Sequence, residues 1–237
     1  MGILPFVSVV VPTLNEEKYI ENCLKALKNQ NYKGRYEIIV ADGMSRDRTA
    51  KIAKEFADKV IVVKKRGAAA ERNAGAKEAE GEILLFIDAD TVANFNLITE
   101  IAKAFRGKVV GTTCPILPLS SDIADFVLYY IFNEFIKASM MTKTPQVVGS
   151  LCAYKTNVFN RVNGFDEKLL NSEDWDLSKR ISRLGKIKFV DSTFVLTSTR
   201  RIRKWGRARA VARYVKYYLD YVLRGKTVGV DKYRPIR

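Results

Sequence analysis

The first half of the chain alternates between two hydrophobic periods, and this alternation constrains the fold more than any other feature. Short apolar runs, rich in β-branched residues, alternate with segments whose apolar residues recur at helical spacing. Repeated strand–helix units need crossover connections, which are right-handed and place helices on both faces of a mostly parallel sheet. The predicted strands cover residues 6–11, 36–41, 60–63 and 82–87, and the predicted helices between them cover 15–28, 46–56 and 68–80.

The second half is less regular but continues as mixed helix and strand. The predicted helices cover residues 97–105, 121–141, 173–184 and 207–223, with a helical turn at 159–162; the predicted strands cover 109–114, 147–155, 187–190 and 194–197. The sequence therefore predicts an α/β fold, and in such sheets ligands bind beyond the carboxyl ends of the strands.

Positive charge is concentrated at the end of the chain. The formal net charge is +15, and residues 200–237 contain 13 Lys and Arg against two Asp, so the other 199 residues carry about +4. Such a distribution favours contact with an anionic partner, namely phosphate, lipid head groups or nucleic acid; the alternative is a solvated basic face. The last helix is amphipathic. One face holds Ala208, Val211, Ala212, Val215, Leu219 and Val222, and another holds Arg209, Arg213, Lys216 and Asp220.

The chain has no histidine, which excludes histidine zinc sites, Ser-His-Asp triads and imidazole acid–base chemistry. Its three cysteines have no metal-like spacing and favour a reducing compartment. We see no signal peptide, and charged residues interrupt the longest apolar stretch, 123–141, so that it does not cross a bilayer unaided. We therefore expect a cytoplasmic protein, with peripheral attachment to the inner face of the membrane as a further option.

Two carboxylates follow the fourth predicted strand directly, in Asp88-Ala89-Asp90. Side chains two apart point to the same side of an extended backbone, so together they can hold a hard divalent cation through oxygen ligands. Such a cation can bridge a diphosphate and neutralise a leaving group. The alternative interpretation is a solvated turn.

Two further segments lie at strand or helix ends. Asp42 follows the second strand, where its carboxylate can accept hydrogen bonds from a nucleobase or ribose. Arg72 lies in a small-residue segment, 67–75, that opens a helix and suits a phosphate. Helix capping by Asp47 and a close-packed helix with Arg72 at its edge are the structural alternatives.

Six ordered motifs resemble the family 2 glycosyltransferases. They are Val7-Ser-Val-Val-Val-Pro-Thr-Leu-Asn-Glu16, Ala41-Asp-Gly-Met-Ser-Arg-Asp-Arg-Thr49, Arg72-Asn73-Ala-Gly75, Asp88-Ala-Asp90, Val162-Asn-Gly-Phe-Asp-Glu167 and Ser172-Glu-Asp-Trp-Asp-Leu177. The resemblance covers residues 6–190. It implies a GT-A (Rossmann-like) fold, a nucleotide-diphosphate sugar donor, Mg²⁺ or Mn²⁺ on Asp88 and Asp90, and inversion at the anomeric carbon.

The resemblance also implies roles for single residues. The residues expected to bind the nucleotide sugar are Pro12, Thr13, Asn15, Glu16, Asp42, Arg72, Asp88, Ala89 and Asp90. We expect a glycosyltransferase domain at 1–199, with a nucleotide-sugar half at 1–114 and an acceptor half at 115–199, followed by a basic amphipathic extension at 200–237.

Asp174 is the expected catalytic base. An acceptor hydroxyl needs a carboxylate within hydrogen-bond reach as it attacks, and Asp174 matches the family's Glu-Asp pair. Glu173 and Trp175 are expected to contact the acceptor. The alternative is that residues 172–174 only cap the next helix and complement its dipole.

The sequence departs from the family where many relatives carry a metal-binding histidine. Here the stretch reads Arg200-Arg201, which we expect to bind the donor diphosphate or an acceptor phosphate. The aromatic segment 126–135 and the basic tail favour a lipid-linked acceptor at an anionic membrane surface. A carboxylate base favours an acceptor hydroxyl on a saccharide or a lipid-linked glycan. Transfer to a polyprenyl phosphate is an alternative.

Two rival functional classes fit less well. A nucleotidyltransferase usually has a glycine-rich basic loop after its first strand, and here that turn is Pro-Thr-Leu-Asn-Glu. A basic nucleic-acid-binding protein would spread its charge along a recognition surface, whereas most of this chain is nearly neutral, so no nucleic acid is expected. The sequence does not identify the donor base or sugar.

Overall fold

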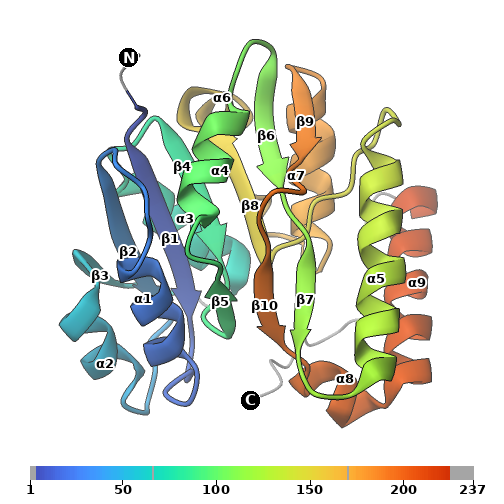
Figure 1. The fold of residues 1–237 in the computed structure, drawn as a ribbon, viewed down its shortest axis with the longest axis horizontal. Helices are drawn as coiled ribbons and strands as arrows, with labels where there is room; N and C mark the ends of the chain where they lie inside the picture. The colour runs from blue at the N-terminus through green and yellow to red at the C-terminus, as the bar shows by residue number, and fades with distance from the viewer. Residues whose placement is uncertain (1–3, 66, 170, 225–237) are drawn as a thin grey trace.

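The framework of the protein is a seven-stranded, mostly parallel sheet (Figure 1). The computed structural model describes residues 4–65, 67–169 and 171–224. Within this sheet β8 runs antiparallel to β4 and to β6, while the other paired strands are parallel. The strand order is β3 (Lys59–Val62), β2 (Tyr36–Asp42), β1 (Val7–Thr13), β4 (Ile83–Ile87), β8 (Leu151–Lys155), β6 (Val109–Thr113) and β9 (Lys186–Phe189).

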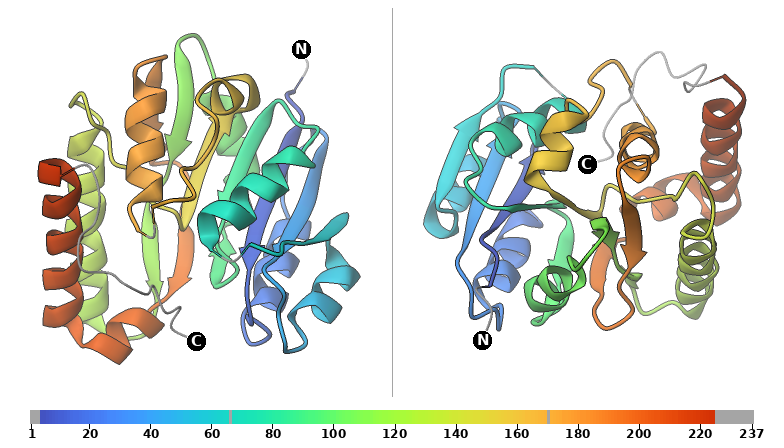
Figure 2. Two further views of the ribbon diagram at one scale, coloured as in Figure 1. Left: turned by 180° about the vertical axis from the view of Figure 1, so that it is seen from behind. Right: turned by 90° about the horizontal axis from the view of Figure 1, so that it is seen from above.

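Helices cover both faces of this sheet, as the alternating sequence predicts (Figures 1 and 2). Because successive side chains of a strand point to opposite faces, Val9 and Val10 of β1 belong to two different cores. The core around Val9 includes α1 (Ile20–Lys28), α2 (Thr49–Phe56) and α4 (Leu97–Ala104), and the core around Val10 includes α3 (Ala68–Lys77), α6 (Thr156–Arg161) and α7 (Glu173–Ser182).

A second sheet of three short strands lies beside the first, and only one of its strands was predicted. Its order is β5 (Thr91–Ala93), β10 (Val195–Ser198) and β7 (Ile116–Leu119). Pairing of β10 with β5 carries residue 198 back to the Asp-x-Asp turn, where the Ser198 N–H donates to the Asp90 carbonyl at 3.1 Å. This sheet therefore brings the basic C-terminal segment to the end of β4.

Two predicted boundaries differ from the structure by four residues or more. The first helix begins at Ile20 rather than Asn15, because Asn15 takes a left-handed conformation with φ of 54°. The strand expected from Val147 begins at Leu151, because the Val148 carbonyl accepts from the Leu151 N–H and closes a turn through Gly149.

The helices α5 (Ile123–Ser139) and α9 (Arg207–Arg224) lie side by side at one edge of the molecule (Figures 1 and 2). The rings of Phe135 and Tyr218 meet edge-on at 5.5 Å, and Arg207 Nε donates to Asp125 Oδ1 at 2.8 Å. The short helix α8 (Arg200–Trp205) connects β10 to α9. None of the helices within the described residues is both long and apolar enough to span a bilayer. Residues 225–237 of the expected extension, and the side chain of Val222, lie outside the described part.

Candidate active site

The carboxyl ends of β1 and β2 hold a hydrogen-bonded turn. Thr13 and Asp42 are register partners, the Thr13 hydroxyl lies 3.3 Å from Asp42 Oδ1, and the Ser45 N–H donates to Asp42 Oδ2 at 3.0 Å. Pro12 is buried beside them in β1. Asp42 therefore has a structural role that the sequence had not suggested, although carboxylate oxygens can accept more bonds than these.

The loop after β1 is tied to the loop after β2. The Asn15 N–H donates to Ser45 Oγ at 2.8 Å, and the Arg46 N–H donates to Asn15 Oδ1 at 2.7 Å. The Glu16 N–H donates to Thr49 Oγ1 at 2.7 Å. These bonds join Asn15 and Glu16, which are predicted to bind the nucleotide sugar, to the loop after β2. We call the cluster of Thr13, Asn15, Glu16 and Asp42 the rim.

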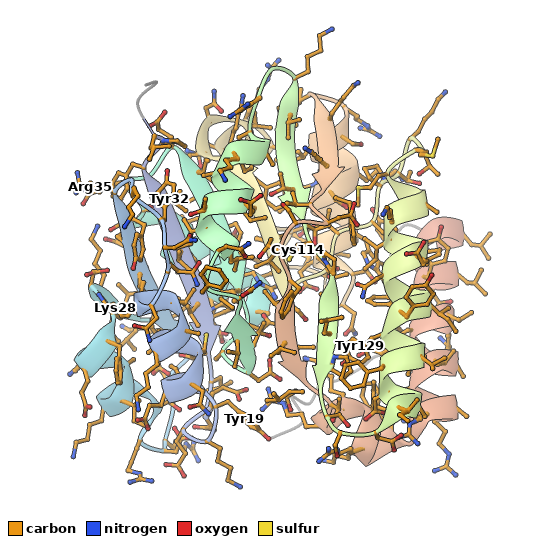
Figure 3. The ribbon with its side chains drawn as sticks, viewed as in Figure 1. Tyr19, Lys28, Tyr32, Arg35, Cys114 and Tyr129 are labelled. Atoms are coloured by element: carbon orange, nitrogen blue, oxygen red, sulfur yellow. The ribbon has the colours of Figure 1, made fainter. Side chains whose placement is uncertain are left out.

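Arg200, which lies near the other end of the chain, is hydrogen-bonded to this rim. Its two terminal nitrogens donate to the two carboxylate oxygens of Glu16 at 2.6 and 2.7 Å, which is a bidentate pair. Its Nε lies 3.1 Å from Asp90 Oδ2, and its guanidinium stacks 5.0 Å from the Tyr19 ring centroid. Figure 3 shows Tyr19 near the lower end of β1. The expected proximity of Arg200 to the Asp-x-Asp turn is therefore present in the structure.

The electrostatics of Asp90 reflect both burial and neighbouring charges. Burial is the main reason that its pKa is raised to about 6; the Asp88 carboxylate also acts to raise the pKa, and Arg200 and Arg201 act to lower it. Arg201 thus lies close enough to act on the same carboxylate. Ala89, between the two aspartates, is buried.

Arg72 is buried at the centre of the site, with 2% of its surface exposed. One terminal nitrogen donates to Asp88 Oδ1 at 2.8 Å and to the Gly149 carbonyl at 3.1 Å, and the other donates to Glu173 Oε1 at 2.8 Å. Arg72 is therefore not at an exposed helix edge; it joins the Asp-x-Asp turn to the Glu-Asp pair of α7.

Asp174 lies beside this arginine and is positioned by backbone groups. The Gly149 N–H donates to Asp174 Oδ2 at 2.8 Å, and the Trp175 N–H donates to Oδ1 at 2.9 Å. Burial raises the pKa of Asp174 to about 7, and the neighbouring Glu173 carboxylate adds to the rise. A carboxylate with a pKa near neutrality suits a general base.

The capping interpretation of residues 172–174 is only partly correct. Ser172 precedes α7 in a left-handed conformation with φ of 65°, and its hydroxyl makes no capping bond and has no hydrogen-bond partner although it is buried.

The Trp175 ring packs against Tyr218 and Tyr221 of α9, at 5.7 and 6.3 Å between centroids. The structure therefore gives Trp175 a packing role between α7 and α9.

Sequence reasoning missed two residues of this site. Gly149 bridges Arg72 and Asp174 through its carbonyl and its N–H, and a methyl group on it would lie 2.6 Å from an Arg72 nitrogen. Glu71 is 5% exposed, its Oε1 accepts from the Gly67 N–H at 3.3 Å, and burial raises its pKa to about 7. No sequence signal identified Gly149, because its partners are distant in the chain.

The carboxylate oxygens of Asp88 and Asp90 are suitable ligands for a hard divalent cation. Both side chains lie at the end of a strand. Within the described residues, no group of three or more acidic or cysteine side chains is placed to hold a metal by itself. Mg²⁺ is commonly bound by one or two carboxylates with substrate phosphates and water completing its shell. These two residues therefore fit a cation that arrives with a diphosphate.

The fold is of the GT-A type, as in solved glycosyltransferase structures. The model of the family named "Glycosyl transferase family 2" matches residues 8–162, which is more than half of the chain. The chain therefore belongs to glycosyltransferase family 2.

Individual known proteins agree with this assignment. The probable glycosyltransferase YdaM of Bacillus subtilis is 30% identical over 204 residues, which are 78% of this chain and 48% of that protein. The mannosyltransferase PcManGT from Pyrobaculum calidifontis, solved in complex with GDP-Man and Mn²⁺, superposes with a TM-score of 0.67 at 22% identity, covering 89% of this chain and 64% of that one. TarS of Staphylococcus aureus, solved with UDP-GlcNAc, gives 0.65 at 23% identity, covering 81% and 58%.

These comparisons differ in what they establish. The two structural similarities concern the fold. The chain spans about half of the length of YdaM, so the other half of that protein has no counterpart in the match.

Proposed function

We propose that this chain transfers a sugar from a nucleotide-diphosphate sugar to an acceptor hydroxyl, with inversion at the anomeric carbon and with a divalent cation held by Asp88 and Asp90. The observation that supports the proposal is the junction at Arg72, whose guanidinium donates to both Asp88 and Glu173. The Asp-x-Asp turn lies on one side of its guanidinium and the Glu-Asp pair on the other.

The donor would lie against the rim formed by Thr13, Asn15, Glu16 and Asp42. A bound cation would neutralise charge on the departing diphosphate. Arg200 provides a fixed positive charge at the same place, since its Nε is 3.1 Å from Asp90. The complexes of PcManGT with GDP-Man and Mn²⁺ and of TarS with UDP-GlcNAc support a nucleotide-sugar donor and a cation here.

Asp174 would act on the acceptor. Its carboxylate accepts the proton of the acceptor hydroxyl as the oxygen attacks the anomeric carbon and the bond to the diphosphate breaks. The pKa of Asp174 near 7 favours this role, because the group is then ionised in a useful fraction and still basic.

The acceptor we propose is a saccharide or a lipid-linked glycan. A hydroxyl acceptor fits a positioned carboxylate better than an already ionised polyprenyl phosphate, which would need the arginines more than Asp174. In domain terms, we propose a catalytic unit at 1–199 whose site is completed by Arg200, the first residue of the extension.

The experiment is a transfer assay with UDP- and GDP-sugars against saccharide and lipid-linked acceptors, with product detected by mass spectrometry. Transfer by the wild type, lost in Asp174→Asn with donor binding retained, supports the proposal. Equal transfer by the variant, or transfer only to a polyprenyl phosphate, contradicts the hydroxyl-acceptor mechanism. Retained anomeric configuration in the product, measured by NMR, contradicts inversion.

A further inference from the structure

Within the part of the chain that the structure describes, the packing of α9 leaves its apolar face uncovered. Towards the domain this helix buries Ala210 and Tyr221, which are 1% and 6% exposed, and its tyrosines contact Trp175 and Phe135. Val211, Val215 and Leu219 follow each other at intervals of four, so they form one stripe, and they are 39% to 51% exposed. The apolar face that the sequence indicates is therefore turned to solvent.

A second apolar stripe lies on α5. Ile123, Val127 and Ile131 also follow at intervals of four and are 53% to 79% exposed. The next residue in this row is Phe135, whose ring meets Tyr218, the neighbour of Leu219 on α9. Because α5 and α9 lie side by side (Figures 1 and 2), the two stripes form one surface, which we call the α5/α9 apolar face.

Basic side chains border this face. Arg209 and Arg213 lie along α9 and are exposed, as are Arg203 and Lys204 of α8; Lys216, also exposed on α9, is paired with Asp220 at 2.6 Å. The acidic residues Asp122 and Asp125 at the start of α5 are already paired with Arg207, and Glu134 is an exposed acid on the outer side of α5. The border is therefore mainly positive.

We propose that the α5/α9 apolar face docks on an anionic lipid bilayer, lying in its interfacial plane. Soluble monomers rarely expose contiguous apolar surface of this kind, which marks a contact site. An apolar helical face with a Lys/Arg border is the chemistry that binds acidic head groups and inserts side chains just below them. The charge of the border selects a lipid surface over a second copy of this equally basic chain.

Docking on this face has a geometric consequence for the site. Arg200, which pairs with Glu16 and Asp90, is the first residue of α8, and α9 begins at Arg207. The site is thus linked to the docked surface by one short helix, which suits an acceptor carried by lipid. The docking itself goes beyond the transfer reaction and does not depend on it.

The test is flotation of the full chain with vesicles, in the absence of donor, metal and acceptor. We expect binding to phosphatidylcholine vesicles containing phosphatidylglycerol, and binding weaker by about tenfold or more to phosphatidylcholine alone. A variant with serines in the α5/α9 apolar face, which we call the apolar variant, should bind about tenfold or more weakly. Its circular dichroism spectrum should not change, because only exposed side chains are replaced. The apolar variant carries Val127→Ser, Ile131→Ser, Val215→Ser and Leu219→Ser.

Two further variants sharpen the result. Arg203→Gln with Lys204→Gln and Arg209→Gln should remove the preference for anionic vesicles. The control, Val62→Ser with Phe95→Ser, removes apolar side chains elsewhere that are even more exposed, at 68% and 62%, and should bind as the wild type does.

Three outcomes would overturn the proposal. These are equal flotation of the apolar variant and the control, absence of wild-type binding to either vesicle, and a wild-type dimer in light scattering that the apolar variant dissociates. The last would assign the face to a second copy of the chain. Because no nucleotide sugar is present, a failure here is distinct from a failure of the transfer assay.

Discussion

Arg72 donates to Glu173 at 2.8 Å, across 101 residues of sequence, and this contact joins α3 to α7. The same guanidinium donates to Asp88, so one buried cation balances carboxylates from both halves of the site. Removing it leaves these acids without their partner in a poorly solvated place.

We predict that Arg72→Ala lowers transfer by about 100-fold or more and the free energy of unfolding by roughly 3 kcal/mol. Arg72→Lys should recover part of the stability but little activity, because a lysine cannot bridge two carboxylates with a planar fork. Urea unfolding and initial rates measure the two effects. Arg35→Ala is the control, since the Arg35 side chain is 71% exposed in its pair with Glu80 and its loss should cost about 1 kcal/mol or less. Loss of activity in Arg35→Ala as well would argue against a special role for Arg72.

Gly149→Ala should lower the rate of transfer nearly as much as Arg72→Ala does. The added methyl group would meet an Arg72 nitrogen at 2.6 Å, so Arg72 must move away from Asp88. We expect transfer to fall by about 100-fold and the unfolding midpoint to fall less than in Arg72→Ala, because the guanidinium still lies near the acids. Ser150→Ala in the same turn keeps the backbone and should retain wild-type rates. Full activity in Gly149→Ala would mean that the position of Arg72 is not critical.

The pH dependence of transfer should report Asp174. Its pKa is raised by burial to about 7, and the base must be ionised, so kcat/KM should rise with pH through about 7 and then level off. Asp174→Asn should lose this rising limb and about 10²- to 10⁴-fold in rate. A wild-type profile that is flat between about pH 6 and pH 8 would contradict the assignment.

Glu71 should make the fold more stable at low pH. Burial raises its pKa to about 7 in the folded protein, so folding takes up a proton and this stabilisation is lost as pH rises from the unfolded pKa towards 7. Glu71→Gln keeps an acceptor for the Gly67 N–H and should raise stability at pH 8 by on the order of 1–3 kcal/mol. Near pH 4 the two proteins should melt alike. An unchanged difference in melting temperature at both pH values would show that Glu71 is not protonated on folding.

Local sequence patterns predicted much of this structure. The β-branched runs and the helical spacing of the first half gave the parallel sheet with helices on both faces, because these periods arise within each segment. The Asp-x-Asp turn and Arg200 were also expected at the site, and the structure brings them together.

The features that sequence patterns did not predict depend on contacts between residues that are far apart in the chain. Strands β5 and β7 have three and four residues, and their pairing is completed only by β10. Gly149 is hydrogen-bonded to two side chains that lie 77 and 25 residues away. Amphipathicity identified the apolar stripe of α9, but tyrosines on the other side of the helix decide which face packs against the domain.

Metal-dependent donor binding tests the central claim most directly. Calorimetric titration of the wild type with UDP- and GDP-sugars, each with and without Mn²⁺, is compared with titration of Asp90→Asn. The account predicts that one nucleotide class binds, that Mn²⁺ strengthens its binding by about tenfold or more, and that Asp90→Asn removes this gain while remaining folded. Binding of no nucleotide sugar under either condition, or Mn²⁺-strengthened binding that persists in Asp90→Asn, would contradict it.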